Sequence, residues 1–243
     1  MREHSARPER GSAVVVGVGP GLGAALARRF AADGLPVAMA ARDPSDLEWL
    51  RDELTGHVPA RLVACDATEP EQVDALFAEV ERELAPPGLV VYNAGAFVRG
   101  DVLETTPEEF LRCWRVGCYG GFLVARAAAR GMVERGRGTI LFTGATASLR
   151  GSAGFVNLAV GKFGLRALAQ SLARELGPKG VHVAHVVIDG QIAAPERADA
   201  VSRKPPDALL SPDAIAAEYA RLHAQRRSAW TFELDLRPWV ERF

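Results

Sequence analysis

The chain alternates short apolar runs, rich in β-branched residues, with longer stretches in which apolar positions recur every three to four residues. Short apolar runs of this kind predict strands that are buried on both faces. The longer stretches predict amphipathic helices, and in the first of them Leu22, Leu26 and Phe30 share one face. The predicted strands cover residues 13–18, 36–41, 61–65, 89–92, 139–143, 181–188 and 231–236.

Capping residues indicate where several helices begin. Pro44-Ser45-Asp46 opens one helix, and Thr68-Glu69-Pro70-Glu71 supplies an N-terminal cap followed by proline for the next. Thr106-Pro107-Glu108-Glu109 does the same for a long helix that runs to about residue 134, with Gly120-Gly121 as the expected place of any break. A further helix is expected over residues 153–176, because Gly177-Pro178 is a strong stop signal.

The alternation of strands and helices predicts the fold class. We expect a single doubly wound α/β domain over residues 12–243, with a seven-stranded, mostly parallel sheet and helices on both faces. The charged residues 1–11 are predicted to be a disordered tail. Residues 191–211 are polar and rich in proline, without helical periodicity, and are therefore predicted to form a lid-like loop.

Composition excludes several classes of function. The net charge is −1 and the basic residues are spread along the 243 residues, which argues against a nucleic-acid partner or a membrane surface. No apolar run reaches the ~18 residues of a membrane span, so the expected location is the cytoplasm. The three cysteines have no metal-ligand spacing with each other or with histidine, and no metal is expected.

A glycine-rich turn follows the first predicted strand and opens the first helix. Its sequence is Gly17-Val18-Gly19-Pro20-Gly21-Leu22-Gly23. Glycines allow the backbone to turn tightly and to approach a pyrophosphate, whose charge is favoured at a helix N-terminus. In this strand–turn–helix context the turn predicts a nucleotide-binding site.

Further motifs carry a family resemblance over most of the chain. Cys65-Asp66-Ala67 and Tyr92-Asn93-Ala94-Gly95 end two successive strands, and Gly17-x-x-x-Gly21-x-Gly23 precedes them. Together with residues 142–148 and 154–162 they resemble the motifs of short-chain dehydrogenases/reductases. The resemblance implies a Rossmann-type domain, a nicotinamide cofactor and a small-molecule substrate.

The same resemblance marks the positions where that family performs its proton chemistry. The family's serine position is Ala145, its tyrosine position is Leu158, and its structural asparagine aligns with Gly117. Lys162 remains, and the resemblance implies that it binds the nicotinamide ribose. Asp189, at the end of the sixth strand, could exchange protons if it is desolvated, or it could simply form a tight turn with the next residue.

Charge at the end of the second strand bears on the choice of cofactor. An acid there would accept from the ribose 2′-hydroxyl of NAD, whereas a cation would bind the 2′-phosphate of NADP. The acid's position is Ala41 and the next residue is Arg42, which favours NADP(H) over NAD(H); Asp43 is expected to cap the following helix. The expected cofactor contacts are Gly17, Gly21, Leu22, Gly23, Arg42, Asp66, Ala67, Asn93, Ala94, Gly95, Lys162 and Ile192.

Three classes of function follow from these observations. The favoured one is an NADP(H)-dependent oxidoreductase with an atypical active site, acting on a small carbonyl, imine or enone. The alternatives are a non-redox enzyme (a cyclase, dehydratase or isomerase) and a catalytically silent nucleotide-binding subunit. The small residues on the two long helices also resemble a family interface, so a homodimer or homotetramer is expected.

Overall fold

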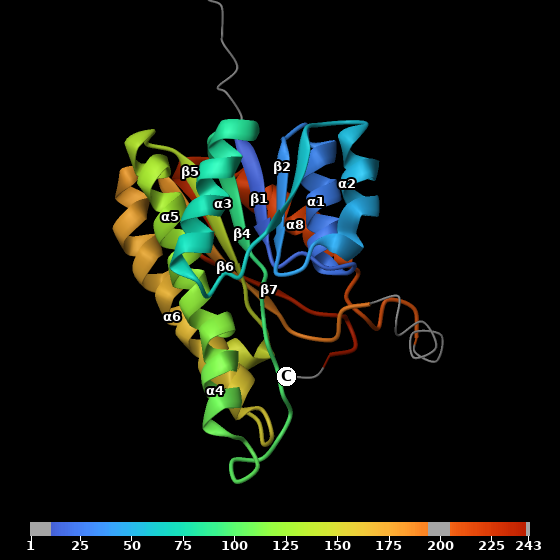
Figure 1. Ribbon diagram of the computed structural model, residues 1–243. Coiled ribbons are helices and arrows are strands. Elements are labelled where there is room, and N and C mark those ends of the chain that lie inside the picture. Colours follow the sequence, from blue (N-terminus) through green and yellow to red (C-terminus); the bar gives the residue numbers. More distant parts are fainter. Residues whose placement is uncertain (1–10, 194–204, 242–243) are drawn as a thin grey trace, which may run out of the picture.

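A single parallel sheet forms the centre of the protein. The computed structural model describes residues 11–193 and 205–241. Its sheet has seven strands in the order β3-β2-β1-β4-β5-β6-β7, and each neighbouring pair is parallel (Figure 1). The strands are β1 (Ser12–Val16), β2 (Val37–Ala41), β3 (Ala60–Ala64), β4 (Pro87–Tyr92), β5 (Gly138–Thr143), β6 (Val181–Ile188) and β7 (Glu233–Leu236). The predicted α/β class and strand order along the chain are confirmed.

Helices cover both faces of the sheet. One face carries α1, α2 and α8, and the other carries α3, α5 and α6, while α4 extends beyond the carboxyl ends of the strands (Figure 1). The helices are α1 (Leu22–Ala32), α2 (Glu48–Thr55), α3 (Pro70–Glu83), α4 (Pro107–Trp114), α5 (Gly120–Glu134), α6 (Val156–Leu176) and α8 (Pro212–His223). Shorter helical turns are η1 (Ser45–Leu47), η2 (Arg115–Tyr119), η3 (Thr146–Ser148), η4 (Gly177–Lys179) and η6 (Arg227–Ala229).

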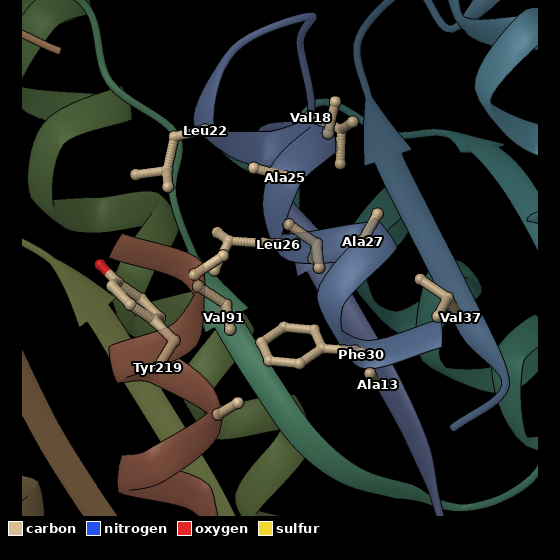
Figure 2. Close-up of a cluster of buried hydrophobic side chains, with 14 of the residues drawn as sticks. Ala13, Val18, Leu22, Ala25, Leu26, Ala27, Phe30, Val37, Val91 and Tyr219 are labelled. Atoms are coloured by element: carbon tan, nitrogen blue, oxygen red, sulfur yellow. The ribbon is translucent and has the colours of Figure 1, made fainter. Parts of the chain in front are cut away.

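The core has two layers because strand side chains alternate between the faces. In β1, Val15 faces the layer with α1 and α8, whereas Val14 and Val16 face the layer with α3 and α5. Figure 2 shows the first layer, in which Leu26 and Phe30 of α1 lie between the sheet and α8. Both side chains are essentially unexposed. This packing fixes the start of α1 against the end of β1.

One helix prediction needs correction, and one helix was missed. The long helix is not broken at Gly120-Gly121; it contains a π-helical segment, η2, that ends just before them. The hydroxyl of Tyr92 donates to the carbonyl of Val116 at 2.6 Å. This carbonyl, within the π-helical segment, therefore has a hydrogen-bond partner outside the helix. Helix α8 was not predicted, although Ser211 caps it by accepting from the backbone of Ala214.

The predicted tail and lid lie mostly outside the described residues. Residues 1–10 and 194–204 belong to the parts that the structure does not describe. At the two ends of the predicted lid, Ile192 forms a bridge with Leu210, and Ala193 donates to the Leu210 carbonyl at 2.9 Å. Within the described residues, no helix is long and apolar enough to cross a membrane.

Candidate functional site

The glycine-rich turn connects β1 to α1 at the carboxyl edge of the sheet. Gly17 has a φ of 90°, and a Cβ placed there would lie 2.4 Å from the backbone nitrogen of Ala94. A side chain at Gly23 would meet the Cα of Val18 at 2.7 Å. At position 17 only glycine allows both the positive φ and the close approach to Ala94, and at position 23 glycine allows the close approach to Val18. The turn is therefore pressed against the end of β4, and Asn93 secures it by donating from Nδ2 to the Gly17 carbonyl at 2.9 Å.

A cavity of about 570 Å³ lies over this turn and the neighbouring strand ends. Cavities in this position, outside the carboxyl ends of parallel strands, are where open α/β sheets bind ligands. The predicted contacts that line it are Gly17, Arg42, Asp66, Ala67, Asn93, Ala94 and Gly95. Of the remaining predicted contacts, Gly21 is the N-cap of α1, Leu22 is the buried first residue of α1, and Ile192 is partly buried and packs against the core cluster that contains α1.

The edge of the cavity at β2 carries Arg42 and Asp43, which are both exposed. Oδ1 of Asp43 accepts from the backbone and the hydroxyl of Ser45 at 3.0 and 2.6 Å. These hydrogen bonds hold the pKa of Asp43 below its ordinary value. Asp43 therefore binds Ser45, the first residue of η1, whose N-cap is Pro44, and Arg42 is a cation at the rim of the cavity.

Asp66 combines a local structural bond with a place in the cavity. Its Oδ1 accepts from the backbone and hydroxyl of Thr68 at 2.9 and 2.8 Å, which is a typical turn arrangement. Its backbone N–H donates to Oε1 of Gln72 at 2.8 Å. The carboxylate thus stabilises the turn after β3 while it lines the cavity beside Ala67.

Lys162 is buried, and it is not a solvated helix lysine. It is 6% exposed, and its Nζ donates to the carbonyl of Thr143, at the end of β5, at 2.7 Å. The ammonium also approaches the cavity, because a Cβ on Gly95 would lie 3.9 Å from Nζ. Burial lowers the pKa of Lys162 from 10.5 to about 8. The predicted cofactor lysine is thus brought next to the turn that ends β4.

Gly117 lies where the π-helical segment meets α6. A Cβ at Gly117 would be 3.2 Å from the Cα of Gly161, and the reverse contact is equally short. The two backbones approach closely because neither residue has a side chain. A larger residue at position 117 would require α6 to move, so glycine here has a packing role.

Ala145 and Leu158 lie around the end of β5 and the start of α6. Both are partly buried, and neither side chain can donate or accept a proton. Ser148, which completes the short helical turn after Ala145, is fully buried, and its Oγ accepts from the backbone of Ala145 at 3.1 Å. Ser148 therefore stabilises this turn from within.

Tyr219 is a phenol near the same strand end, but it belongs to the other layer. It extends from α8 into the cluster of Figure 2, and its hydroxyl pairs with Oγ1 of Thr143 at 2.9 Å. Burial raises its pKa above the ordinary value for tyrosine. Lys162 comes from α6, on the opposite face of the sheet. Tyr219 is consequently a core residue.

Asp189 follows β6 directly and is 5% exposed. Its Oδ1 accepts from the hydroxyl of Thr146 at 2.5 Å, and its Oδ2 lies 3.8 Å from Nη1 of Arg237. The next residue, Gly190, has a φ of 148°, and a Cβ there would lie 2.7 Å from Cδ of Pro238. The tight turn of Asp189 with Gly190 stays a prediction, and the structure adds a threonine partner for Asp189 that the sequence did not indicate.

Sequence reasoning also missed a partly buried charge network that joins α6, β6 and β7. Glu233 of β7 accepts two hydrogen bonds from Arg166 of α6 at 2.7 and 2.8 Å, and it lies 3.0 Å from Nδ1 of His185. Burial lowers the pKa of His185 to about 4, despite the opposing effect of Glu233. His185 and Glu233 are register partners in the sheet, so only the strand pairing could have revealed the contact.

Comparisons with known proteins agree with this geometry. A family model described as short chain dehydrogenase matches residues 12–202. A 3-oxoacyl-[acyl-carrier-protein] reductase MabA from Mycobacterium avium is 34% identical over 181 residues, which cover 74% of this chain and 67% of the relative.

Two solved structures extend the likeness to almost the whole chain. A short-chain dehydrogenase from Rhodopseudomonas palustris is 39% identical, with a TM-score of 0.81 and coverage of 96% of this chain and 100% of the other. A metagenomic short-chain oxidoreductase in complex with NADP is 27% identical, with a TM-score of 0.81 and coverage of 95% and 98%. The chain therefore belongs to the short-chain dehydrogenase family.

Proposed function

We propose that this protein is an NADP(H)-dependent oxidoreductase that moves a hydride between the nicotinamide ring and a small carbonyl, imine or enone compound. The observation that carries the proposal is the cavity at the carboxyl edge of the sheet, with a cation at its β2 rim and the buried ammonium of Lys162 beyond Gly95. A dinucleotide needs anion-binding backbone at its centre and polar contacts at each end. Family membership supports the same assignment.

The arrangement of charges supports NADP(H) over NAD(H). Arg42 lines the cavity, whereas the neighbouring Asp43 is engaged by Ser45. A guanidinium forms strong hydrogen bonds with the 2′-phosphate of NADP(H), whereas NAD(H) has only a 2′-hydroxyl at that position. A relative crystallised with NADP supports this choice.

Lys162 is proposed to hold the nicotinamide ribose. An ammonium has three donors, and Thr143 accepts one of them. The ribose hydroxyls would accept from the others, and the bound nucleotide would supply or take up the hydride. Because Nζ lies close to Gly95, this contact would keep the nicotinamide end above β4 and β5.

Ala145 and Leu158 make the proposed active site atypical. Leu158 lies one helical turn before Lys162 on α6, and Ala145 follows two residues after Thr143, whose carbonyl accepts from Lys162. Neither side chain can polarise a carbonyl or transfer a proton. A general acid typically contributes a factor of about 10²–10⁴. We therefore infer either a substrate that depends little on proton transfer, such as an activated carbonyl or an imine, or a replacement proton donor. The same two residues also favour the alternative of a non-redox enzyme on this scaffold.

The cofactor assignment is tested with Arg42→Ala. We expect NADPH affinity to fall by about 1.5–3 kcal/mol, the usual range for a hydrogen bond to a charged group, while NADH affinity stays the same. Isothermal titration calorimetry with both nucleotides measures this. Arg51→Ala, which removes an exposed arginine of α2 paired with Asp52, is the matched control. Equal affinity of the unaltered protein for NADPH and NADH would contradict the assignment.

The redox assignment needs a separate measurement. Stopped-flow absorbance should detect NADPH oxidation with at least one member of a panel of ketones, imines and enones. Tight NADPH binding without hydride transfer to any of them would favour a non-redox enzyme or a catalytically silent subunit.

A further inference from the structure

A hydroxyl and a carboxylate form a short hydrogen bond at the ends of β5 and β6. Thr146 Oγ1 donates to Asp189 Oδ1 at 2.5 Å, although the residues are 43 positions apart. Asp189 is 5% exposed, whereas Thr146 is partly exposed in the first turn after β5. A carboxylate is rarely buried unless it is paired and hydrogen-bonded. The hydrogen bond between Thr146 and Asp189 therefore belongs to the folded structure and is unlike a contact between two exposed side chains.

The surroundings fix the direction of the carboxylate. The backbone N–H of Asp189 donates to the carbonyl of Leu236 at 2.8 Å, which continues the pairing of β6 with β7. Its Oδ2 lies 3.8 Å from the guanidinium of Arg237, so a positive charge faces that oxygen. With Oδ2 turned towards Arg237, Oδ1 is the oxygen presented to Thr146.

The pair follows the strand end that Lys162 contacts. Lys162 donates to the carbonyl of Thr143, the last residue of β5, and Thr146 begins the helical turn η3 three residues later in the sequence. Three other hydroxyls near this strand end, those of Thr143, Ser148 and Tyr219, are buried; Thr143 and Tyr219 bond to each other, and Ser148 accepts from the backbone of Ala145. Of these four hydroxyls, the one on Thr146 is partly exposed to solvent and bonded to an acid.

We propose that Thr146 and Asp189 form the proton-transfer site of this enzyme, with Thr146 touching the reacting oxygen or nitrogen and Asp189 acting through it. This inference rests on the oxidoreductase function proposed above. In alcohol oxidation, the substrate O–H proton passes to Thr146 Oγ1 as the Thr146 proton passes to Asp189 Oδ1. A bound oxidised nicotinamide would accept the hydride from the carbon that carries this oxygen, and the electron pair of the O–H bond would complete the C=O bond. Asp189 then gives the proton to solvent.

Reduction is the reverse, and it defines the class of substrate that needs the pair. Hydride addition to a ketone places negative charge on oxygen, which takes the proton of Thr146, and Thr146 recovers one from the protonated Asp189. A quaternary iminium ion accepts a hydride to give a neutral amine and needs no proton. The pair should therefore matter for ketones and should not matter for quaternary iminium ions.

The test compares two probes in three variants. NADPH oxidation is measured with 1-phenyl-1,2-propanedione as the ketone and N-methyl-3,4-dihydroisoquinolinium as the iminium ion. We expect Thr146→Val to lower kcat for the ketone by about 10²–10⁴-fold, the usual contribution of a general acid, and to change the iminium rate less than about threefold. Thr146→Ser should restore most of the ketone rate. Asp189→Asn should show the same ketone-selective loss as Thr146→Val.

A second threonine–aspartate pair supplies the matched control. Thr68 donates to Asp66 at 2.8 Å at the adenine side of the cavity. Thr68→Val should affect NADPH binding and leave the ratio of ketone to iminium rates unchanged. Thermal melts check folding, and the ketone-selective loss expected of Asp189→Asn keeps the test informative if Thr146→Val does not fold.

The outcomes separate this inference from the proposed function. Ketone and iminium rates that fall together in Thr146→Val, or a ketone rate that does not fall, would overturn the proton-transfer site while leaving an active oxidoreductase. If the iminium ion is not reduced by any form, a solvent deuterium isotope effect on ketone reduction that is the same in wild type and Thr146→Val overturns it. Wild-type protein that binds NADPH and reduces neither these probes nor any other member of the panel would overturn both proposals.

Discussion

At the scale of single residues, Lys162 offers the most direct test of the proposed cofactor site. Its ammonium is buried, donates to the Thr143 carbonyl and lies close to Gly95, which lines the cavity. We expect Lys162→Met to weaken NADPH binding by about 1.5–3 kcal/mol, because a charged hydrogen bond to the ribose is lost. Calorimetry measures the affinity, with thermal melts as the folding control. Unchanged affinity would indicate that the lysine has a purely structural role.

The lowered pKa of Lys162 adds a pH dependence to the same test. Burial places this pKa at about 8 instead of 10.5. Below pH 8 the amine is already charged, whereas above pH 8 a proton must be taken up before it can donate to the ribose. NADPH affinity should thus be constant below pH 8 and fall above it, by up to about tenfold per pH unit. Lys162→Met should remove this fall, and a fall of the same size in the variant would assign it to another group.

At the scale of elements, a charge network ties α6 to the edge of the sheet. Arg166, Glu233 and His185 come from α6, β7 and β6, and His185 is unexposed. The pKa of His185 is about 4, below its ordinary 6.5. Between these two values the unfolded chain binds more protons than the folded one, so stability should fall as pH decreases from 6.5 to 4.

The expected size of this effect can be measured against a variant. A shift of this size corresponds to about 3 kcal/mol of unfolding free energy, fully lost near pH 4. Urea unfolding measures the unfolding free energy at pH 7 and pH 4.5. The decrease between these two pH values should be smaller in His185→Asn than in wild type. His57→Asn removes an exposed histidine after α2 and should behave like wild type. If the unfolding free energy of His185→Asn falls as much on acidification as that of wild type, protonation of His185 does not account for the loss.

The sequence predicted the strands well because each is a short apolar run between turn residues, as in Val14, Val15 and Val16. It did not predict α8, whose apolar residues follow a proline-rich segment that has no periodicity of its own. The π-helical segment also could not be anticipated, since it depends on a contact between Tyr92 and Val116 that are 24 positions apart.

The candidate site was predictable to different degrees at its two ends. The adenine side is encoded by local motifs, and Gly17, Asp66 and Asn93 do line one cavity. The contacts around β5 and β6 are not local. The bond between Thr146 and Asp189 depends on how two strands end side by side, which residue types alone do not reveal.

At the scale of the whole molecule, the helices on the two faces of the sheet position different parts of the candidate site. The layer with α1 and α8 anchors the glycine turn, while the layer with α5 and α6 holds Lys162 and the π-helical segment. Strand β7 ends the sheet, and an unpaired edge is a common place for another chain to bind. Apolar side chains left exposed on the helices are the other candidate contact surface.

We predict a homodimer or homotetramer in which α5 and α6 pack against a second copy. Phe122 of α5 and Phe163 of α6 are each 43% exposed, although aromatic side chains of this size are usually covered. The double variant Phe122→Glu/Phe163→Glu should dissociate the oligomer, because buried, unpaired carboxylates are costly in an interface. Light scattering at micromolar concentration measures the mass. Trp49→Glu, at a 44% exposed aromatic on α2, should leave it unchanged. A monomer mass for the unaltered protein would reject the prediction, because Phe122 and Phe163 would then not be covered by a second copy of the chain.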